Sequence, residues 1–64
     1  MREVELWQRM EEVLGAGYAR VWAENTVLAE LGSRTVVQAI DAGIPSKRIW
    51  LAVWAQLELP PKLR

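Results

Sequence analysis

The sequence contains neither cysteine nor histidine. Without cysteine it can form no disulfide and offers no thiol for catalysis or metal binding. Without histidine it lacks the commonest zinc ligand and the commonest general base. A chain of 64 residues makes one domain at most, and such a domain buries only about 60% of its unfolded surface. Its stability is therefore expected to come from tight packing or from association.

Apolar runs of about 18 residues are also missing, so no segment is expected to span a membrane. The start, Met1–Glu5, is charged and has no apolar core of a secretory signal. The adjacent carboxylates Glu11 and Glu12 diverge on a helix, so they do not form an acid–base pair. No acidic metal loop and no glycine-rich phosphate loop is present. We therefore expect a cytoplasmic, non-enzymatic protein without metal, cofactor or small-molecule ligand.

Tryptophan and an uneven charge distribution are what the sequence does have. Its four tryptophans are either anchors of a thin core or parts of an exposed docking patch: Trp7, Trp22, Trp50 and Trp54. Residues 1–32 carry three cations and six carboxylates, whereas residues 33–64 carry five cations and two carboxylates. This asymmetry marks either a basic binding face or an attraction between the two halves. We favour the attraction, because five cations spread over 32 residues form no dense patch.

The hydrophobic spacing predicts two helices in the first half of the chain. Apolar residues at helical intervals indicate a first helix over about residues 3–14, which Gly15 and Gly17 end. A second helix is expected over about residues 18–31, with Tyr18, Val21, Trp22 and Leu28 on its buried face. Asn25 interrupts that face. Either the helix breaks near Asn25-Thr26 and Asn25 caps a second short helix, which we favour, or Asn25 makes a buried hydrogen bond.

The second half predicts a short helix and a longer one. Thr35-Val36-Val37-Gln38 fits a capping box, so a helix is expected over about residues 35–42. Gly43 follows as a left-handed stop, and Ile44 can contact the preceding helix. Ser46 is the expected N-cap of a helix over about residues 47–58. Residues 59–64 then form a short, proline-rich basic tail of the single domain 1–64.

The residues around Gly43 have the spacing of a helix-turn-helix. Ala39 is a small residue at the expected crossing point, Gly43-Ile44 forms the turn, and Ile49 locks the second helix. In the DNA-binding form of that motif the second helix offers polar side chains to base edges. Here it offers Lys47 and Arg48, and then mostly large apolar residues. The pair is therefore interpreted as structural, in an all-α, compact bundle of about four helices.

Several segments carry a resemblance to known proteins: Met1-Arg2, Trp7–Glu11, Gly15–Ala19, Trp22-Ala23, Val27–Gly32, Arg34–Val36, Ala39–Gly43 and Ile49–Val53. In these segments the sequence resembles a family of short actinobacterial proteins described only as a domain of unknown function. Val4 departs from the pattern, because family members place Ser or Thr near that position to cap the first helix. The resemblance implies no chemistry. Family members are often encoded near recombinase genes, which implies a setting in DNA metabolism.

We interpret the chain as an interaction module that binds a protein or associates with itself. The alternative is a DNA-associated accessory protein, for recombination or repair, that uses the helix-turn-helix-like pair. The expected partner-binding residues lie on the last helix: Lys47, Arg48, Leu51 and Trp54. One of Leu51 and Trp54 should be substantially exposed, because a helix this apolar has neighbours on one side only. Exposed indoles would favour a protein partner, whereas buried indoles under a basic rim would favour nucleic acid.

Overall fold

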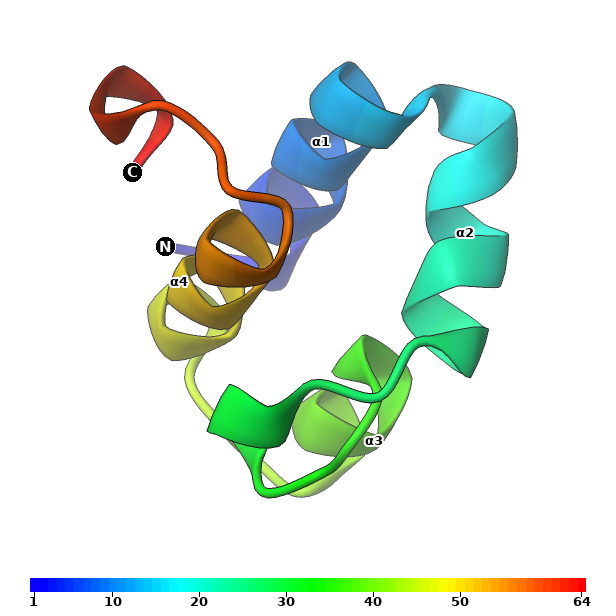
Figure 1. Ribbon diagram of the computed structural model, residues 1–64. Coiled ribbons are helices and arrows are strands. Elements are labelled where there is room, and N and C mark those ends of the chain that lie inside the picture. The colour runs from blue at the N-terminus through cyan, green and yellow to red at the C-terminus, as the bar shows by residue number, and fades with distance from the viewer.

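A computed structural model describes all of residues 1–64 and contains helices but no strand (Figure 1). The predicted all-α bundle is confirmed. One isolated antiparallel bridge joins Leu28 to Arg34. No helix has the length and apolar run that crossing a membrane requires. The elements are α1 (Glu3–Leu14), α2 (Ala16–Asn25), α3 (Val36–Asp41) and α4 (Ser46–Gln56), with the 3-10 helices η1 (Ala29–Leu31) and η2 (Pro61–Leu63).

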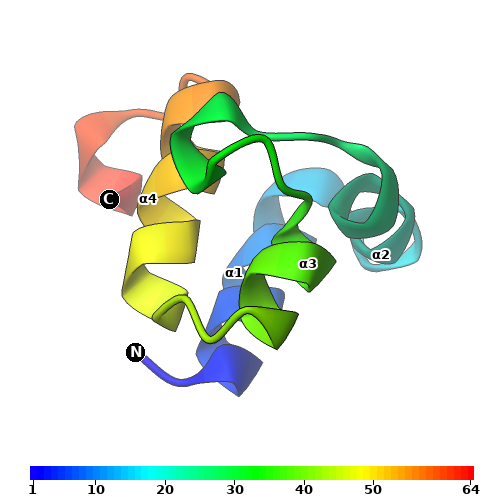
Figure 2. The ribbon, with the colours of Figure 1, turned by 90° about the horizontal axis from the view of Figure 1, so that it is seen from below.

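The four α-helices surround one core. α1 packs against α2 and α4, and α3 closes the bundle between α2 and α4 (Figures 1 and 2). η1 lies against α4, and the C-terminal segment lies beside α4 on the side away from α2. The core consists of thirteen buried apolar residues: Leu6, Met10, Ala19, Trp22, Ala23, Leu28, Leu31, Val36, Ala39, Ile49, Trp50, Ala52 and Val53.

The end of α1 follows the prediction only in part. The helix covers Glu3–Leu14 as expected, and Gly15 ends it with φ +89°, a conformation that favours glycine. Gly17 is not a stop, because α2 already begins at Ala16. One glycine is sufficient to reverse the chain here, so the second lies within the new helix.

The buried face of α2 differs from the predicted one. Tyr18 and Val21, expected inside, are 55% and 51% exposed. Trp22 and Leu28 are buried as expected, and the other buried residues of α2 are Ala19 and Ala23. The two alanines place the α2 backbone close to its neighbours, and the large indole then fixes the rotation of the helix. Placing Tyr18 and Val21 on the face of Trp22 therefore gave the wrong rotation.

The chain breaks after Asn25, as the favoured interpretation predicted, but Asn25 caps no second helix. α2 ends there, and the backbone is extended through Thr26 to Leu28 before η1. Asn25 is exposed, and its side-chain amide donates a hydrogen bond of 2.8 Å to the Val21 carbonyl within the same helix. The residue therefore stabilises the last turn of α2.

The start and the stop of α3 are the ones predicted. The Gln38 backbone N–H donates to the Thr35 hydroxyl at 3.1 Å, and the Thr35 N–H donates to the Gln38 side chain at 2.9 Å. Gly43 has φ +80°, and the Ile44 N–H reaches back to the Ala39 carbonyl at 3.0 Å. These bonds form the Schellman ending of a helix. Four residues, 42–45, connect α3 to α4.

α4 begins one residue earlier than predicted. Pro45 is the N-cap and Ser46 is the first helical residue, without a capping bond from its side chain. The restricted φ of Pro45, −58°, already suits the entry to a helix, so no hydroxyl cap is required. The helix ends at Gln56, two residues before the predicted end.

Candidate interaction site at the basic end

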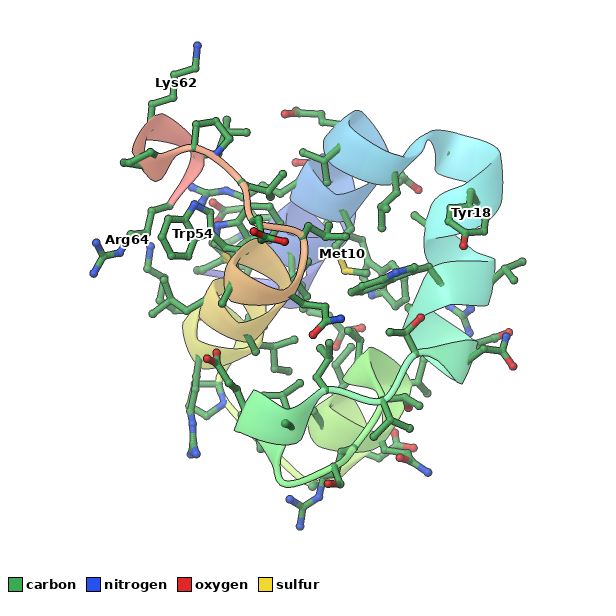
Figure 3. All side chains as sticks on the ribbon, in the orientation of Figure 1. Met10, Tyr18, Trp54, Lys62 and Arg64 are labelled. Carbon is green, nitrogen blue, oxygen red and sulfur yellow. The ribbon has the colours of Figure 1, made fainter.

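Residues 59–64 fold back over α4 and α1, and we call them the C-terminal strap. Pro60 has the φ and ψ of a polyproline helix, −66° and 154°, and η2 follows it. Leu59 packs against the core, whereas residues 60–64 are all exposed. Figure 3 shows Lys62 and Arg64 at one edge of the molecule, with Tyr18 on the opposite side.

Two tryptophans of α4 hold the strap through their indole N–H groups. Trp54 donates to the Pro60 carbonyl at 2.9 Å. Trp50 donates to the Leu63 carbonyl at 2.9 Å and to the Arg64 carbonyl at 3.2 Å. The acceptors are main-chain carbonyls, so this recognition depends on the path of the strap more than on its side chains.

Two cations also converge on the Arg64 carbonyl. Lys47 from α4 donates to it at 3.0 Å, and Arg9 from α1 donates at 3.4 Å. The Arg9 guanidinium lies 5.6 Å from the centre of the Trp50 ring, and the Arg64 guanidinium lies 5.4 Å from the Trp54 ring. Both distances are within the range of cation–π attraction. Charged groups therefore cover the indoles of α4.

We call Arg9, Lys47, Lys62 and Arg64 the basic end. A cleft of about 250 Å³ opens here, and it brings Arg9, Lys62 and Arg64 together with one carboxylate, Glu12. None of these side chains pairs with an Asp or Glu side chain. The expected attraction between the two halves of the chain is therefore not realised in ion pairs, because the single salt bridge joins Arg20 and Glu24 within α2.

Of the five cations in residues 33–64, Lys47, Lys62 and Arg64 meet at the basic end, where Arg9 from the first half joins them. Sequence spacing separates Lys47 from the strap, but the backward fold of the strap brings them together. Arg9 lies one helical turn after Glu5, yet its guanidinium donates to the Arg64 carbonyl. One chemical signal in the sequence indicated that a segment packs over these tryptophans, because a buried indole N–H needs a hydrogen-bond acceptor. The sequence does not say which carbonyl supplies it.

Three of the predicted partner-binding residues, Lys47, Arg48 and Leu51, lie on the outward side of α4, and Trp54 lies between this side and the buried face. Lys47 and Arg48 are exposed in the first turn. Leu51 is half-buried and is not among the side chains packed against the core, whereas Trp54 is. The structure brings Lys47 and Trp54 together around the strap, and Arg48 makes no hydrogen bond to it.

The expectation of one substantially exposed residue among Leu51 and Trp54 is not met. Both are half-buried, and Trp54 is covered in part by the strap of its own chain. Trp50 and Val53 are buried, Trp50 with 1% exposure. The strap thus takes the neighbouring position that a partner was expected to take.

The fold and this site define a small all-helical protein with a basic surface above two indoles. No group of three or more His, Cys, Asp or Glu side chains lies close enough to hold a metal ion. Residues 1–62 match the family described as "Protein of unknown function (DUF3046)", and the chain belongs to that family. No curated protein and no solved structure matches it.

Proposed function

We propose that this chain is a small, non-enzymatic interaction module of the cytoplasm that binds an acidic surface of a partner protein. The observation that carries the proposal is the basic end: four cations from α1, α4 and the strap gather, and no Asp or Glu side chain pairs with any of them. An excess of positive charge at one end of a molecule attracts a partner of opposite charge and orients its approach.

The outward side of α4 supports a protein partner over a nucleic acid. Leu51 lies in its middle, with Lys47 one turn before and Trp54 beside it on the next turn. Apolar and aromatic side chains within a basic rim are typical of the centre of a protein interface. Beyond the first turn, α4 offers only the exposed Gln56 as a side chain suited to reading base edges.

A second candidate function is binding to DNA phosphates, and a specific observation favours it. Trp50 is buried beneath Arg9, and Arg64 lies over Trp54, so the indoles lie under a basic rim. α3 and α4, with their four-residue connection, would act as a helix-turn-helix-like pair. The resemblance to proteins encoded near recombinase genes suggests a recombination or repair setting. The net charge of zero opposes this candidate, because it gives little affinity from counterion release.

Fluorescence anisotropy with two labelled probes separates the candidates. One probe is a helical peptide of alternating glutamate and leucine clusters, and the other is a DNA duplex of mixed sequence. The double variant Lys47→Glu, Arg48→Glu should weaken peptide binding about tenfold or more, because like charges then oppose each other. Leu51→Ala should also weaken peptide binding and leave any duplex binding unchanged. Arg20→Glu is the matched control, since Arg20 is an exposed cation on α2.

Three outcomes would contradict the proposal. Tighter binding of the duplex than of the peptide, unaffected by Leu51→Ala, would favour the second candidate. A loss of binding free energy in Arg20→Glu about half as large as that in the α4 double variant would show a general charge effect and no specific surface, because the control changes one cation and the double variant two. Failure to bind either probe at low salt would remove both candidates.

A further inference from the structure

The groove that holds the strap is a binding site for a main-chain segment. Its donors come from α1 and α4, and they are Arg9, Lys47, Trp50 and Trp54. Every acceptor is a backbone carbonyl of the strap. A site that recognises carbonyls and a polyproline turn accepts the same segment whether it belongs to this copy or to another.

The strap is held by hydrogen bonds and buries little apolar surface. No side chain of η2 is buried, and Leu63 is 36% exposed. Only Leu59, next to the turn, packs against the core. A segment with so little buried apolar surface opens locally without unfolding the rest of the protein. Opening uncovers the indole of Trp50 and leaves its N–H without an acceptor, which favours recapture of a similar segment.

The turn that carries the strap is strained. Glu58 has φ +53°, a left-handed conformation that side chains other than glycine rarely adopt. The Glu58 N–H still donates to the Ala55 carbonyl at 3.2 Å, and the Leu59 N–H donates to the Trp54 carbonyl at 3.1 Å. In an opened chain Glu58 can return to an extended conformation, so opening relieves the strain at this residue.

We propose that two copies of this chain exchange straps, so that residues 59–64 of each copy fill the Trp50–Trp54 groove of the other. The exchanged dimer keeps every strap contact of the monomer and relaxes both Glu58 turns. Short hinges under strain favour such exchange. The exchange needs no acidic partner and is independent of the binding proposed above.

The expected dissociation constant of the strap-exchanged dimer follows from two factors. In the monomer, the strap of the same chain competes with the strap of a second copy for the groove. It does so at an effective concentration of about 1 mM, which is therefore the dissociation constant expected for an exchange without strain. Each relaxed turn favours the dimer about fivefold, because a left-handed residue is disfavoured by at least that factor. Two turns bring the expected dissociation constant to tens of micromolar.

Sedimentation velocity over a concentration series tests the exchange with the full chain and two variants at position 58. Glu58→Gly removes the strain, so its dimer should dissociate about 25-fold more readily than the parent. Glu58→Pro cannot adopt a positive φ, so its strap should be unable to close and its dimer should be tighter. Circular dichroism verifies that each variant is folded. If Glu58→Pro does not fold, the comparison of parent and Glu58→Gly decides.

A cross-linking experiment identifies the exchanged segment, because the chain has no cysteine of its own. Glu12 and Lys62 line the same cleft. Equal amounts of Glu12→Cys and Lys62→Cys, mixed and treated with a short bis-maleimide, should give mainly the mixed dimer. A folded Glu58→Pro that stays monomeric, a dimer equally stable in Glu58→Gly, or cross-linking that is as strong within each single variant would overturn the proposal.

Discussion

The turns that follow α3 and α4 have the same backbone design and different residues at the critical position. After α3, the Gly43 N–H donates to the Ile40 carbonyl at 3.0 Å. After α4, the Glu58 N–H donates to the Ala55 carbonyl at 3.2 Å. In both turns the next residue completes a Schellman ending, and the critical residue has a positive φ, +80° for Gly43 and +53° for Glu58.

The segments that the two turns connect explain the difference. The first turn joins two helices that share buried residues, among them Ala39 and Ile49 with no exposed surface. The second turn joins the core to an exposed strap. Glu58, which is strained in its turn, thus lies where opening of the strap uncovers only a surface groove. The turn at Gly43 therefore fixes the fold, whereas the turn at Glu58 is suited to conformational change.

The largest effect should come from the core beside the first turn. Ile49→Ala leaves a cavity between α3 and α4 and should lower the free energy of unfolding by about 2–5 kcal/mol. Leu51→Ala, two residues further along α4, should lower it by less than about 1 kcal/mol, because Leu51 lies outside the core. Urea denaturation followed by circular dichroism measures both. Equal losses would mean that the outward side of α4 is also core.

A smaller effect is expected at the first turn itself. Gly43→Ala should lower the free energy of unfolding by about 1–2 kcal/mol, because alanine is strained at positive φ. A Cβ there would meet no atom within 4 Å, so the loss is conformational and not steric. Gly17→Ala is the matched control, since Gly17 is helical and equally open. It should stabilise the protein by up to about 1 kcal/mol in the same denaturation experiment.

The smallest effect should have the opposite sign. Glu58→Gly removes the strain of the second turn and should raise the free energy of unfolding by about 0.5–1 kcal/mol, after the entropy cost of glycine. Thermal unfolding at low protein concentration, where the monomer prevails, provides the measurement. Glu58→Gln keeps the strain and removes the charge, so its stability should equal that of the parent. A destabilised Glu58→Gly would mean that the two turns are not comparable.

The sequence predicted those parts of the fold that depend on neighbouring residues. The bounds of α1, the capping box of Thr35 and Gln38, and the stop at Gly43 follow from local spacing, and all are confirmed. The rotation of α2 was wrong, because it depends on how closely Ala19 and Ala23 let the helix approach its neighbours. The turn at Glu58 carries no signal at all, since glutamate is an ordinary helical residue.

The candidate site was only half visible in the sequence. Lys47 and Trp54 were selected from the pattern of α4, and both contact the strap. Arg9 and Arg64 were missed, because 55 residues separate the two ends of their hydrogen bond. A basic sequence after two prolines reads as a solvated tail. This segment becomes part of the folded surface only because the indoles of Trp50 and Trp54 donate hydrogen bonds to its carbonyls.

The exposure of the strap affects how often the strap opens and uncovers the surface around Trp50. The backbone hydrogen bonds of η2, from Leu63 to Pro60 and from Arg64 to Pro61, join exposed residues, and Trp50 and Trp54 hold the strap to α4 by hydrogen bonds. We expect these surface bonds to break and reform on the time scale of loop motion, nanoseconds to microseconds, while the core opens only with global unfolding. The Trp50 surface should therefore be uncovered without unfolding of the core. A partner that selects the open form meets it at a frequency set by the hinge, independent of how stable the four-helix core is.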